Sequence, residues 1–444
     1  MPTTATLPRR PATSPSDTAR GREVAPEPTA AMPFRDAGRP PLQRKSGGPP
    51  ECPEPDDRAA TSGARRVPAR TLSEVRLVRP RVSVIVTCYN YGHWLGNCVE
   101  SALAQPGIDV DVLVINDASS DDSSRVAHRL AARDRRVRVI DHESNRGHIP
   151  SVNEALRLVG GDYIVKLDAD DLLTPGSLAR SVALLEARPE VGFAYGRALY
   201  FGQHAREGMS ALHRLVQRRT YEASDHPRAA QTVTPARRWT VWPGDLWLRL
   251  VCARAANCIS QPEVVMRAAT LRAVGDYDEQ LPHTSDLAMW LRLASRADVG
   301  HVDGAVQGLY RVHPKGMQRT VNAGKVPDFR ARLAAFESVL AYSSVPRAGE
   351  LLRIVRSRLA SEALDDACHA YDRGRVHVEP VDAYVAFAID ACRDTPALPL
   401  WARLERRRRI GARWSRYYPP FAVEALLRRL SAELRTARWW RDGV

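Results

Sequence analysis

Lys166-Leu167-Asp168-Ala169-Asp170-Asp171 is an acidic stretch that directly follows the apolar run Tyr163-Ile164-Val165. A short apolar run is typical of a buried strand, and open α/β sheets bind ligands at the carboxyl ends of their strands. Carboxylates this close together repel one another, so we expect them to share a hard divalent cation, Mg²⁺ or Mn²⁺, with the phosphates of a ligand. A solvated turn after the strand is the alternative interpretation, because aspartate is common there.

The sequence on both sides of this stretch alternates between strand and helix patterns. Strands are expected at 81–87, 111–116, 137–141 and 162–167, and helices at 94–103, 122–133, 149–158 and 175–187. This β-α-β-α order predicts an α/β fold with a mostly parallel, doubly wound sheet. Two short strands near 299–302 and 306–311 complete it, and the less regular residues 200–260 are interpreted as an insertion over the site.

The chain divides into three regions by composition. Residues 1–78 are rich in proline and charge and offer little apolar surface, so they are expected to be disordered. Residues 79–320 hold the α/β pattern. Residues 321–444 show helical repeats of Ala, Leu and Arg without a strand signal, which predicts a helical C-terminal region.

The net charge of +14 is concentrated at the two ends of the chain. Residues 1–80 hold 14 Lys/Arg against 9 Asp/Glu, and residues 401–444 hold 12 against 4, which leaves the middle nearly neutral. A nucleic-acid enzyme usually carries its basic charge around its site, so no nucleic-acid partner is expected. The seven cysteines show no metal-binding spacing and are interpreted as reduced thiols. No membrane span or secretory signal is evident, and we expect a cytoplasmic protein.

Two further loops follow strands at the same predicted edge of the sheet. Thr87-Cys88-Tyr89-Asn90-Tyr91 ends the first strand, and Asn116-Asp117 ends the second. A carboxylate at a strand tip can accept hydrogen bonds from a ribose or a base, so Asp117 and Asp168 together suit a nucleotide. Asp121 or Asp122 is interpreted as a helix cap. Neither a P-loop nor a G-x-G-x-x-G motif is present, which excludes phosphate binding by a glycine cradle.

Several segments in this order resemble family 2 glycosyltransferases, which have the GT-A fold. Residues 81–105, 114–123, 145–156 and 161–178 are similar to their nucleotide-binding half. Residues 257–262, 274–279 and 285–294 resemble the acceptor half, and 310–313 the segment that closes the site. The resemblance covers about residues 80–320. It implies an inverting enzyme that moves a sugar from a nucleotide-diphosphate sugar donor to a hydroxyl acceptor, with Mg²⁺ or Mn²⁺ as cofactor.

The resemblance also implies a role for each matching residue. Those expected to bind the donor are Thr87, Tyr89, Asp117, Arg146 and Asp168. Asp170 and His313 are expected at the metal, and Asp286 matches the carboxylate that serves as general base. A single displacement needs one base for the acceptor hydroxyl and a Lewis acid on the leaving diphosphate.

The sequence departs from the family pattern at two positions. Ser285-Asp286 stands where Glu-Asp is common, so capping of the following helix is an alternative role for Asp286. Lys166 stands where an apolar residue is common, and it either pairs with an acidic neighbour or points away from the site. No Gln-x-x-Arg-Trp motif follows, which argues against a processive polymer synthase. The alternatives to an active transferase are an idle nucleotide-sugar or glycan-binding scaffold and a nucleotidyltransferase.

Four histidines resemble a metal set at first sight. His93, His128, His142 and His148 lie in different predicted elements without ligand spacing, so they are interpreted as scattered surface residues.

The last 44 residues form a second constellation. A basic run at 406–409 precedes apolar residues at helical spacing, namely Val423, Leu426, Leu427, Leu430 and Leu434, and the pattern ends in Trp439-Trp440. A basic amphipathic helix suits an anionic membrane surface, where it could bring the protein to lipid-linked or cell-envelope acceptors. A helix docked on the domain with a solvated Arg face explains the pattern equally well.

Overall fold

The computed structural model describes residues 63–76, 78–205, 221, 222, 224, 227, 230, 231, 233–314, 316, 324–341 and 345–443. Most of the segment expected to be disordered, 1–78, lies outside these residues. Its last part, however, contains strand β1 (Arg65–Pro68), which pairs with β9 (Arg238–Trp242), and the short helix α2 (Leu72–Val75). Residues 65–75 thus contain regular secondary structure, although they precede the expected boundary at residue 79.

The described chain is built on one 11-stranded mixed sheet. Its main order is β1-β9-β11-β7-β10-β5-β2-β3-β4. The remaining bounds are β2 (Arg81–Cys88), β3 (Asp109–Asn116), β4 (Val137–Asp141), β5 (Tyr163–Asp168), β6 (Leu172–Leu173), β7 (Val191–Phe201), β8 (Tyr221–Glu222), β10 (Val265–Arg267) and β11 (Asp298–Arg311). Strands β4, β3, β2 and β5 run parallel, as do β7 and β11, whereas β10 is antiparallel to both of its neighbours.

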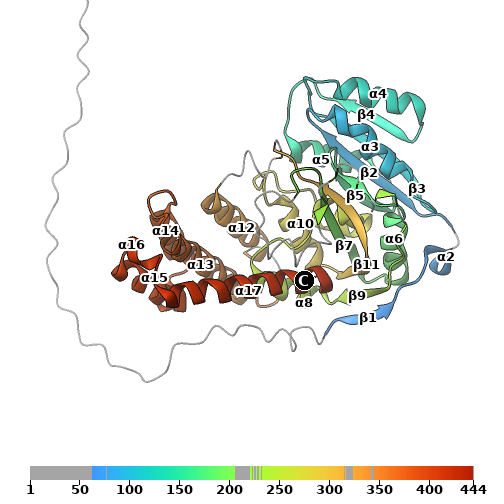
Figure 1. Cartoon of the computed structure of the whole chain (residues 1–444). Helices are drawn as coiled ribbons and strands as arrows, with labels where there is room; N and C mark the ends of the chain where they lie inside the picture. The colour runs from blue at the N-terminus through green and yellow to red at the C-terminus, as the bar shows by residue number, and fades with distance from the viewer. Residues whose placement is uncertain are drawn as a thin grey trace, which may run out of the picture. The chain divides into compact units, whose positions relative to one another are not determined.

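Helices cover both faces of this sheet (Figure 1). The helices α3 (Gly92–Leu103), α4 (Ser123–Arg133) and α6 (Ser177–Ala187) pack with one side of the strands in one apolar cluster. The helices α5 (His148–Leu158), α8 (Gly244–Arg254), α9 (Ala268–Val274) and α10 (Ser285–Ala294) pack in another. In β2, Val84 and Ile85 belong to the two different clusters, which explains why this strand is apolar at consecutive positions. The predicted doubly wound α/β class is confirmed.

The strand register brings three loop starts to one edge of the sheet. Thr87 in β2 is paired with Asp168 in β5 on one side and with Ile115 in β3 on the other. Because the three strands are parallel, the residues that follow each of them emerge at the same edge. This edge carries the polar residues predicted to form the site.

Residues 200–260 are only partly an insertion over the site. Residues 206–220 lie outside the described chain, but β9 and α8 are integral elements, since Trp239, Val241 and Trp247 are buried in the core. The insertion interpretation is therefore wrong for residues 238–254. Sequence periodicity missed them because the strand is short and flanked by arginines.

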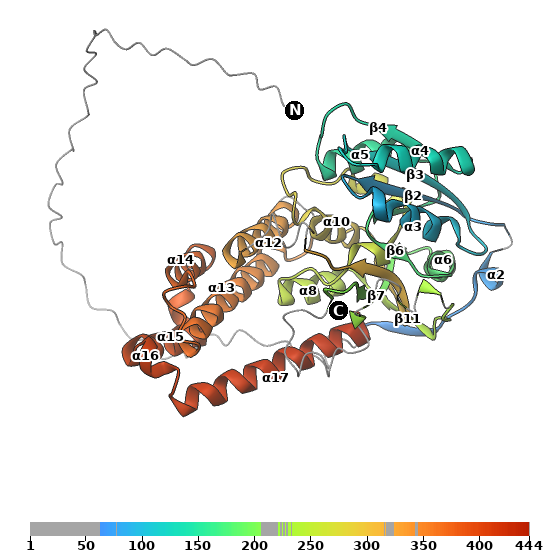
Figure 2. The same cartoon turned by 45° about the horizontal axis from the view of Figure 1, so that its top comes forward.

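The C-terminal region is helical, as predicted. It consists of α12 (Lys325–Leu340), α13 (Ala348–Asp372), α14 (Val381–Ala391), the 3₁₀ turn η3 (Thr395–Ala397), α15 (Pro399–Ile410), α16 (Ala412–Ser415) and α17 (Pro419–Asp442). Helix α12 packs on α10 and α13 packs on α8 (Figures 1 and 2), so this region shares the apolar cluster on one face of the sheet. No described helix combines the length and the apolar character needed to cross a membrane.

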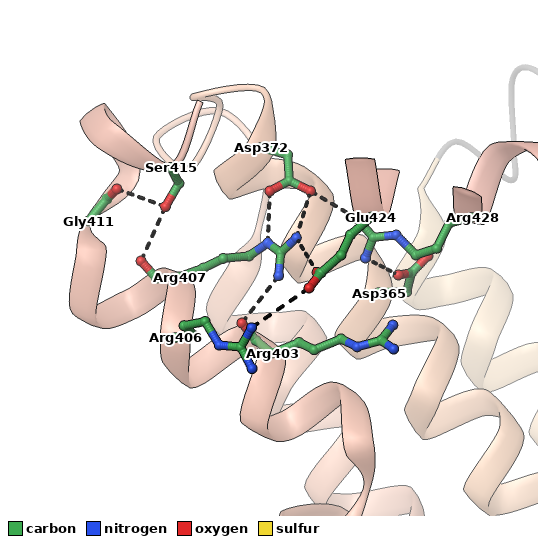
Figure 3. Close-up of polar contacts among 9 residues, drawn as sticks. All are labelled: Asp365, Asp372, Arg403, Arg406, Arg407, Gly411, Ser415, Glu424 and Arg428. Atoms are coloured by element: carbon green, nitrogen blue, oxygen red, sulfur yellow. Dashed lines mark hydrogen bonds and ion pairs between the residues drawn. The ribbon is translucent and has the colours of Figure 1, made fainter. Parts of the chain in front are cut away.

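A buried ionic network joins α13, α15 and α17 (Figure 3). The Arg407 guanidinium is fully buried and donates from Nε to Asp372 Oδ1 at 2.8 Å and from Nη2 to Glu424 Oε2 at 3.1 Å. Arg428 of α17 donates to Asp365 at 2.6 Å and to Asp372 at 2.9 Å. The Arg407 guanidinium also lies 4.0 Å from the centroid of the Phe421 ring. The four arginines at 406–409 are therefore not all directed to solvent, because Arg407 is buried in the interior.

We expect Arg407→Ala to lower the free energy of unfolding by about 3 kcal/mol, because it leaves the carboxylates of Asp372 and Glu424 without their shared buried partner. Urea denaturation measures this change. Arg409→Ala is the matched control, since Arg409 is exposed on the same helix, and we expect it to change stability little. Equal unfolding midpoints for the two variants would contradict the network's structural role.

The carboxyl group of Glu263 is buried in the 3₁₀ turn η2 (Gln261–Glu263), which packs against β5, β7 and β11. Glu263 Oε1 accepts the Ser260 N–H at 2.6 Å, whereas Oε2 is buried without a hydrogen-bond partner. Burial raises the pKa of Glu263 from 4.5 to about 8. The folded state therefore holds a proton that the unfolded chain has released, and stability falls as the pH rises between about 4.5 and about 8.

Glu263→Gln removes this titration while keeping the shape and the acceptor oxygen of the side chain. We expect the variant to match the wild type at the acid end of that range and to melt at least about 2 °C higher at the alkaline end. Differential scanning calorimetry across the range, with the exposed Glu143→Gln as control, measures the difference. A constant difference at every pH would refute the buried-proton explanation.

Candidate active site

The acidic turn after β5 is fixed by its most buried carboxylate. Asp171 is 1% exposed, and its Oδ1 accepts the backbone N–H of Arg311 at 2.8 Å. Burial, together with the neighbouring Asp170 and Asp168, raises the pKa of Asp171 well above its usual value. Asp171 therefore ties the turn to the end of β11, and Asp168 and Asp170 are left to face the site.

The end of β11 brings His313 to the same turn. His313 Nε2 lies 3.1 Å from Asp170 Oδ2, and Arg311 Nε donates to the Asp170 carbonyl at 2.9 Å. The His313 ring packs against Trp94, with 4.5 Å between centroids, and the Arg311 guanidinium lies 4.9 Å from the Trp94 ring. The two residues predicted at the metal, Asp170 and His313, are thus brought together by elements far apart in the sequence.

The turn offers suitable donors for a divalent cation. Asp168 Oδ1 and Asp171 Oδ2 are buried without a hydrogen-bond partner, and Asp170 Oδ2 contacts an imidazole nitrogen. Carboxylate oxygens with one imidazole fit Mg²⁺ or Mn²⁺, which commonly complete their coordination with water and phosphate oxygens. Among the described residues, no group of three or more His, Cys, Asp or Glu side chains is already arranged as a metal cage.

His148 lies between the acidic turn and the end of β2. Its Nδ1 lies 3.2 Å from Thr87 Oγ1 and its Nε2 lies 3.6 Å from Asp168 Oδ1. Burial and the nearby Lys166 ammonium lower the pKa of His148. The interpretation of His148 as a scattered surface residue is wrong, because the start of α5 packs across the ends of β2 and β5. Tyr89, in contrast, is half exposed at the open side of the edge.

Asp117 holds the loop between β4 and α5. Its Oδ1 accepts the Arg146 N–H at 2.8 Å and lies 2.7 Å from His142 Nδ1, and its Oδ2 accepts the Gly147 N–H at 2.8 Å. The Arg146 guanidinium donates to Glu154 at 2.8 Å and is half exposed. Asp117 and Arg146, both predicted to bind the donor, therefore lie side by side, with Asp117 already engaged by the protein.

The remaining histidines and the expected cap are also placed. His142 is buried between Asp117 and Glu154, so its surface interpretation is wrong, whereas His93 and His128 are exposed as expected. Of the two aspartates expected to cap α4, Asp122 is the N-cap residue but makes no side-chain capping hydrogen bond, whereas the preceding Asp121 accepts the Ser123 N–H at 2.9 Å. The aspartate cap was recognisable from the sequence, but the burial of His142 depended on partners in β3 and α5.

A buried ion pair connects the two halves of the site. Lys166 Nζ donates to Asp286 Oδ1 at 3.0 Å and lies 3.3 Å from Oδ2, and the lysine side chain is 3% exposed. Burial acts to lower the pKa of Lys166, but the carboxylates of Asp286 and Asp168 outweigh it and the pKa is raised. Of the two alternatives for Lys166, the structure therefore shows pairing with an acidic neighbour.

The same pair bears on the role of Asp286. Helix α10 begins at Ser285 with Thr284 as its N-cap residue, and the Asp286 carboxylate contacts Lys166 instead of the helix amides. Asp286 is thus directed at β5, two residues before Asp168. Sequence reasoning assigned no role at the site to Arg311, Trp94 or His148, although each lies within a segment of the resemblance.

One part of the chain, residues 83–235, is similar to a known protein family. Residues 83–235 match the model of the family described as glycosyl transferase family 2. The chondroitin synthase of Escherichia coli is 36% identical over 129 residues, which cover 29% of this chain and 18% of that protein. The putative glycosyltransferase EpsE of Bacillus subtilis is 37% identical over 108 residues, covering 24% and 39%. The chain thus spans well under half the length of these relatives.

Among solved structures, that of Staphylococcus aureus TarS residues 1–349 in complex with UDP-GlcNAc is similar to this chain. It has a TM-score of 0.48 at 14% identity and covers 76% of this chain and 89% of that one. The family match falls on β2 to β8, a segment that carries the acidic turn and the loops after β2 and β3. The resemblance predicted from the sequence is confirmed for residues 83–235, which match glycosyl transferase family 2.

Proposed function

We propose that this protein is an inverting glycosyltransferase that moves a sugar from a nucleotide-diphosphate donor to a hydroxyl acceptor. One observation carries the proposal: strand β5 brings close together the two groups that a single displacement needs. Its end carries Asp168 and the turn with Asp170, and two residues earlier Lys166 holds Asp286. A leaving-group site and a base would thus both lie at the same end of β5.

The donor would bind at the edge formed by β2, β3 and β5. We assign Thr87 and Tyr89 to the nucleotide pocket, Asp117 and Asp168 to the base and ribose, and Arg146 to the diphosphate. The Asp117 contacts described above support an indirect part as well, since they fix the loop that presents Arg146. A bound Mg²⁺ or Mn²⁺, held by Asp170 and His313, would supply Lewis-acid stabilisation of the leaving diphosphate.

The acceptor hydroxyl would attack C1 of the sugar on the face opposite the diphosphate. The bond from the acceptor oxygen to C1 forms as the bond from C1 to the diphosphate oxygen breaks, with inversion at C1. Asp286 takes the hydroxyl proton, and the diphosphate leaves with the electron pair. Lys166 holds the Asp286 carboxylate in position through the ion pair, and acts as a positioning residue.

The acceptor class follows only from the reaction. We propose a hydroxyl on a glycan, a lipid-linked molecule or a protein, handled in the cytoplasm for cell-envelope or polysaccharide biosynthesis. Nucleic acid is not expected, since the basic charge lies at the ends of the chain.

One observation favours a second candidate, a nucleotide-sugar-binding scaffold without transferase activity. The Lys166 ammonium lies within 3.3 Å of both oxygens of Asp286, so the ion pair already engages both oxygens that would receive the proton of an acceptor hydroxyl. No contact in the described residues points to the nucleotidyltransferase alternative.

Asp286→Asn distinguishes the two candidates. For a transferase, we expect the variant to bind the donor as the wild type does and to lose at least about 100-fold in the rate of donor turnover, because the proton acceptor is gone. Nucleoside-diphosphate release from a panel of donor sugars, with water or an added hydroxyl compound as acceptor, measures the rate. A scaffold would show no turnover in either protein.

Two further variants make this test specific. Asp276→Asn makes the same chemical change at an exposed carboxylate of the same half, which pairs with Arg157, and should leave turnover unchanged. Lys166→Met removes the positioning ammonium, so we expect about a tenfold lower kcat with donor KM preserved. If Lys166→Met alters KM alone, the ammonium contacts the donor and our assignment of Lys166 is incorrect.

A further inference from the structure

Helix α17 docks on the protein through its polar face. Near its start, Phe421 is buried, Glu424 contacts Arg407, and Arg428 contacts Asp365 and Asp372 (Figure 3). Just past its end, the Tyr195 hydroxyl in β7 donates to the Gly443 carbonyl. Figures 1 and 2 show the helix running from α16 toward α8, so it is anchored at both ends.

The apolar face of the same helix is left in solvent. Five side chains form what we call the apolar stripe, and they are 38% to 61% exposed: Val423, Leu426, Leu427, Leu430 and Leu434. At 100° per residue, the stripe points about 130° away from the face that carries Phe421, Glu424 and Arg428. Amphipathic helices of globular proteins usually bury the apolar face instead. The ionic network therefore holds α17 with its apolar stripe outward, where it is available to a partner.

Aromatic side chains extend the exposed apolar surface at the start of the helix. Trp414 is 64% exposed and Tyr417 69% exposed, and Arg413 and Arg416 lie 5.6 and 5.5 Å from the centroids of these rings. Exposed tryptophan and tyrosine beside arginine are typical of the interface between water and lipid headgroups.

Charge decides between the possible occupants of the stripe. Residues 401–444 hold 12 basic against 4 acidic residues, so the same segment of a second copy would repel it. The N-terminal residues 1–80 are also net basic and make an equally poor partner. An anionic bilayer satisfies both features, because it attracts arginine and accepts an apolar stripe. The stripe is about 17 Å long, which suits a helix that lies in the interface plane.

We propose that α17 and the exposed aromatic residues before it bind the surface of an anionic lipid bilayer, with the apolar stripe inserted at the headgroup level. The polar-face network then has a second role, since it sets the orientation in which the catalytic domain faces the membrane. The proposal does not depend on transferase activity, because binding is measured without substrate.

Flotation of the full-length protein on vesicles tests this proposal. We expect binding to phosphatidylglycerol-containing vesicles, weakened by salt, and little binding to pure phosphatidylcholine. The triple variant Leu426→Gln, Leu427→Gln, Leu434→Gln should lose about tenfold or more in vesicle partitioning. The control variant Val78→Gln, Leu158→Gln, Ile389→Gln changes three exposed apolar residues elsewhere and should bind as the wild type does. If the triple variant unfolds, Leu434→Gln alone serves, with a smaller loss expected.

Three outcomes would overturn the proposal. Equal flotation of wild type and triple variant would show that the stripe makes no contact with lipid. Equal binding to anionic and neutral vesicles would remove the role of charge. A wild-type dimer in sedimentation velocity that the triple variant abolishes, without vesicle binding, would assign the stripe to a second copy of the chain.

Discussion

The site depends on one buried hydrogen bond, from the Arg311 backbone N–H to the Asp171 carboxylate. It links the end of β11 to the turn after β5, two segments separated by 140 residues. Because Asp171 is bonded to the Arg311 amide, the turn after β5 is held against the end of β11. This contact places Asp170 beside His313, which lies two residues after Arg311. A buried oxygen without a hydrogen bond is costly, so the Arg311 amide that satisfies Asp171 Oδ1 also fixes the end of β11 against the turn.

Strand β5 also links this turn to the acceptor half through Lys166. Lys166 lies among apolar residues of β5, and burying its ammonium group costs solvation free energy. The ion pair with Asp286 offsets that cost. The proposed base is thereby held at a fixed position relative to the acidic turn. The consequence is a proposed base that is engaged by its own positioning residue. Whether Asp286 can still take a proton from an acceptor hydroxyl is the point at which a transferase and an inactive scaffold differ.

The sequence was sufficient to predict the parallel strands around the site and the carboxylates at their ends, because apolar runs, turn residues and strand order are local signals. Pairings between distant residues were not accessible in this way. Nothing near Lys166 indicates that its partner lies 120 residues later, and His142 is buried because Asp117 and Glu154 lie on either side of it. In α17 the spacing correctly predicted an amphipathic helix, yet the buried face depends on Arg407 and Asp372, which no helical period reveals.

The most direct test of the central claim is the melting temperature measured against nucleoside diphosphates and their sugars, with and without Mn²⁺, for the wild type and Asp170→Ala. A ligand that binds the folded state raises the melting temperature by mass action. We predict that one nucleotide raises the melting temperature, that this rise requires Mn²⁺, and that it is lost in Asp170→Ala. A rise of equal size without the metal, or one retained in the variant, would contradict a donor site built on the turn after β5.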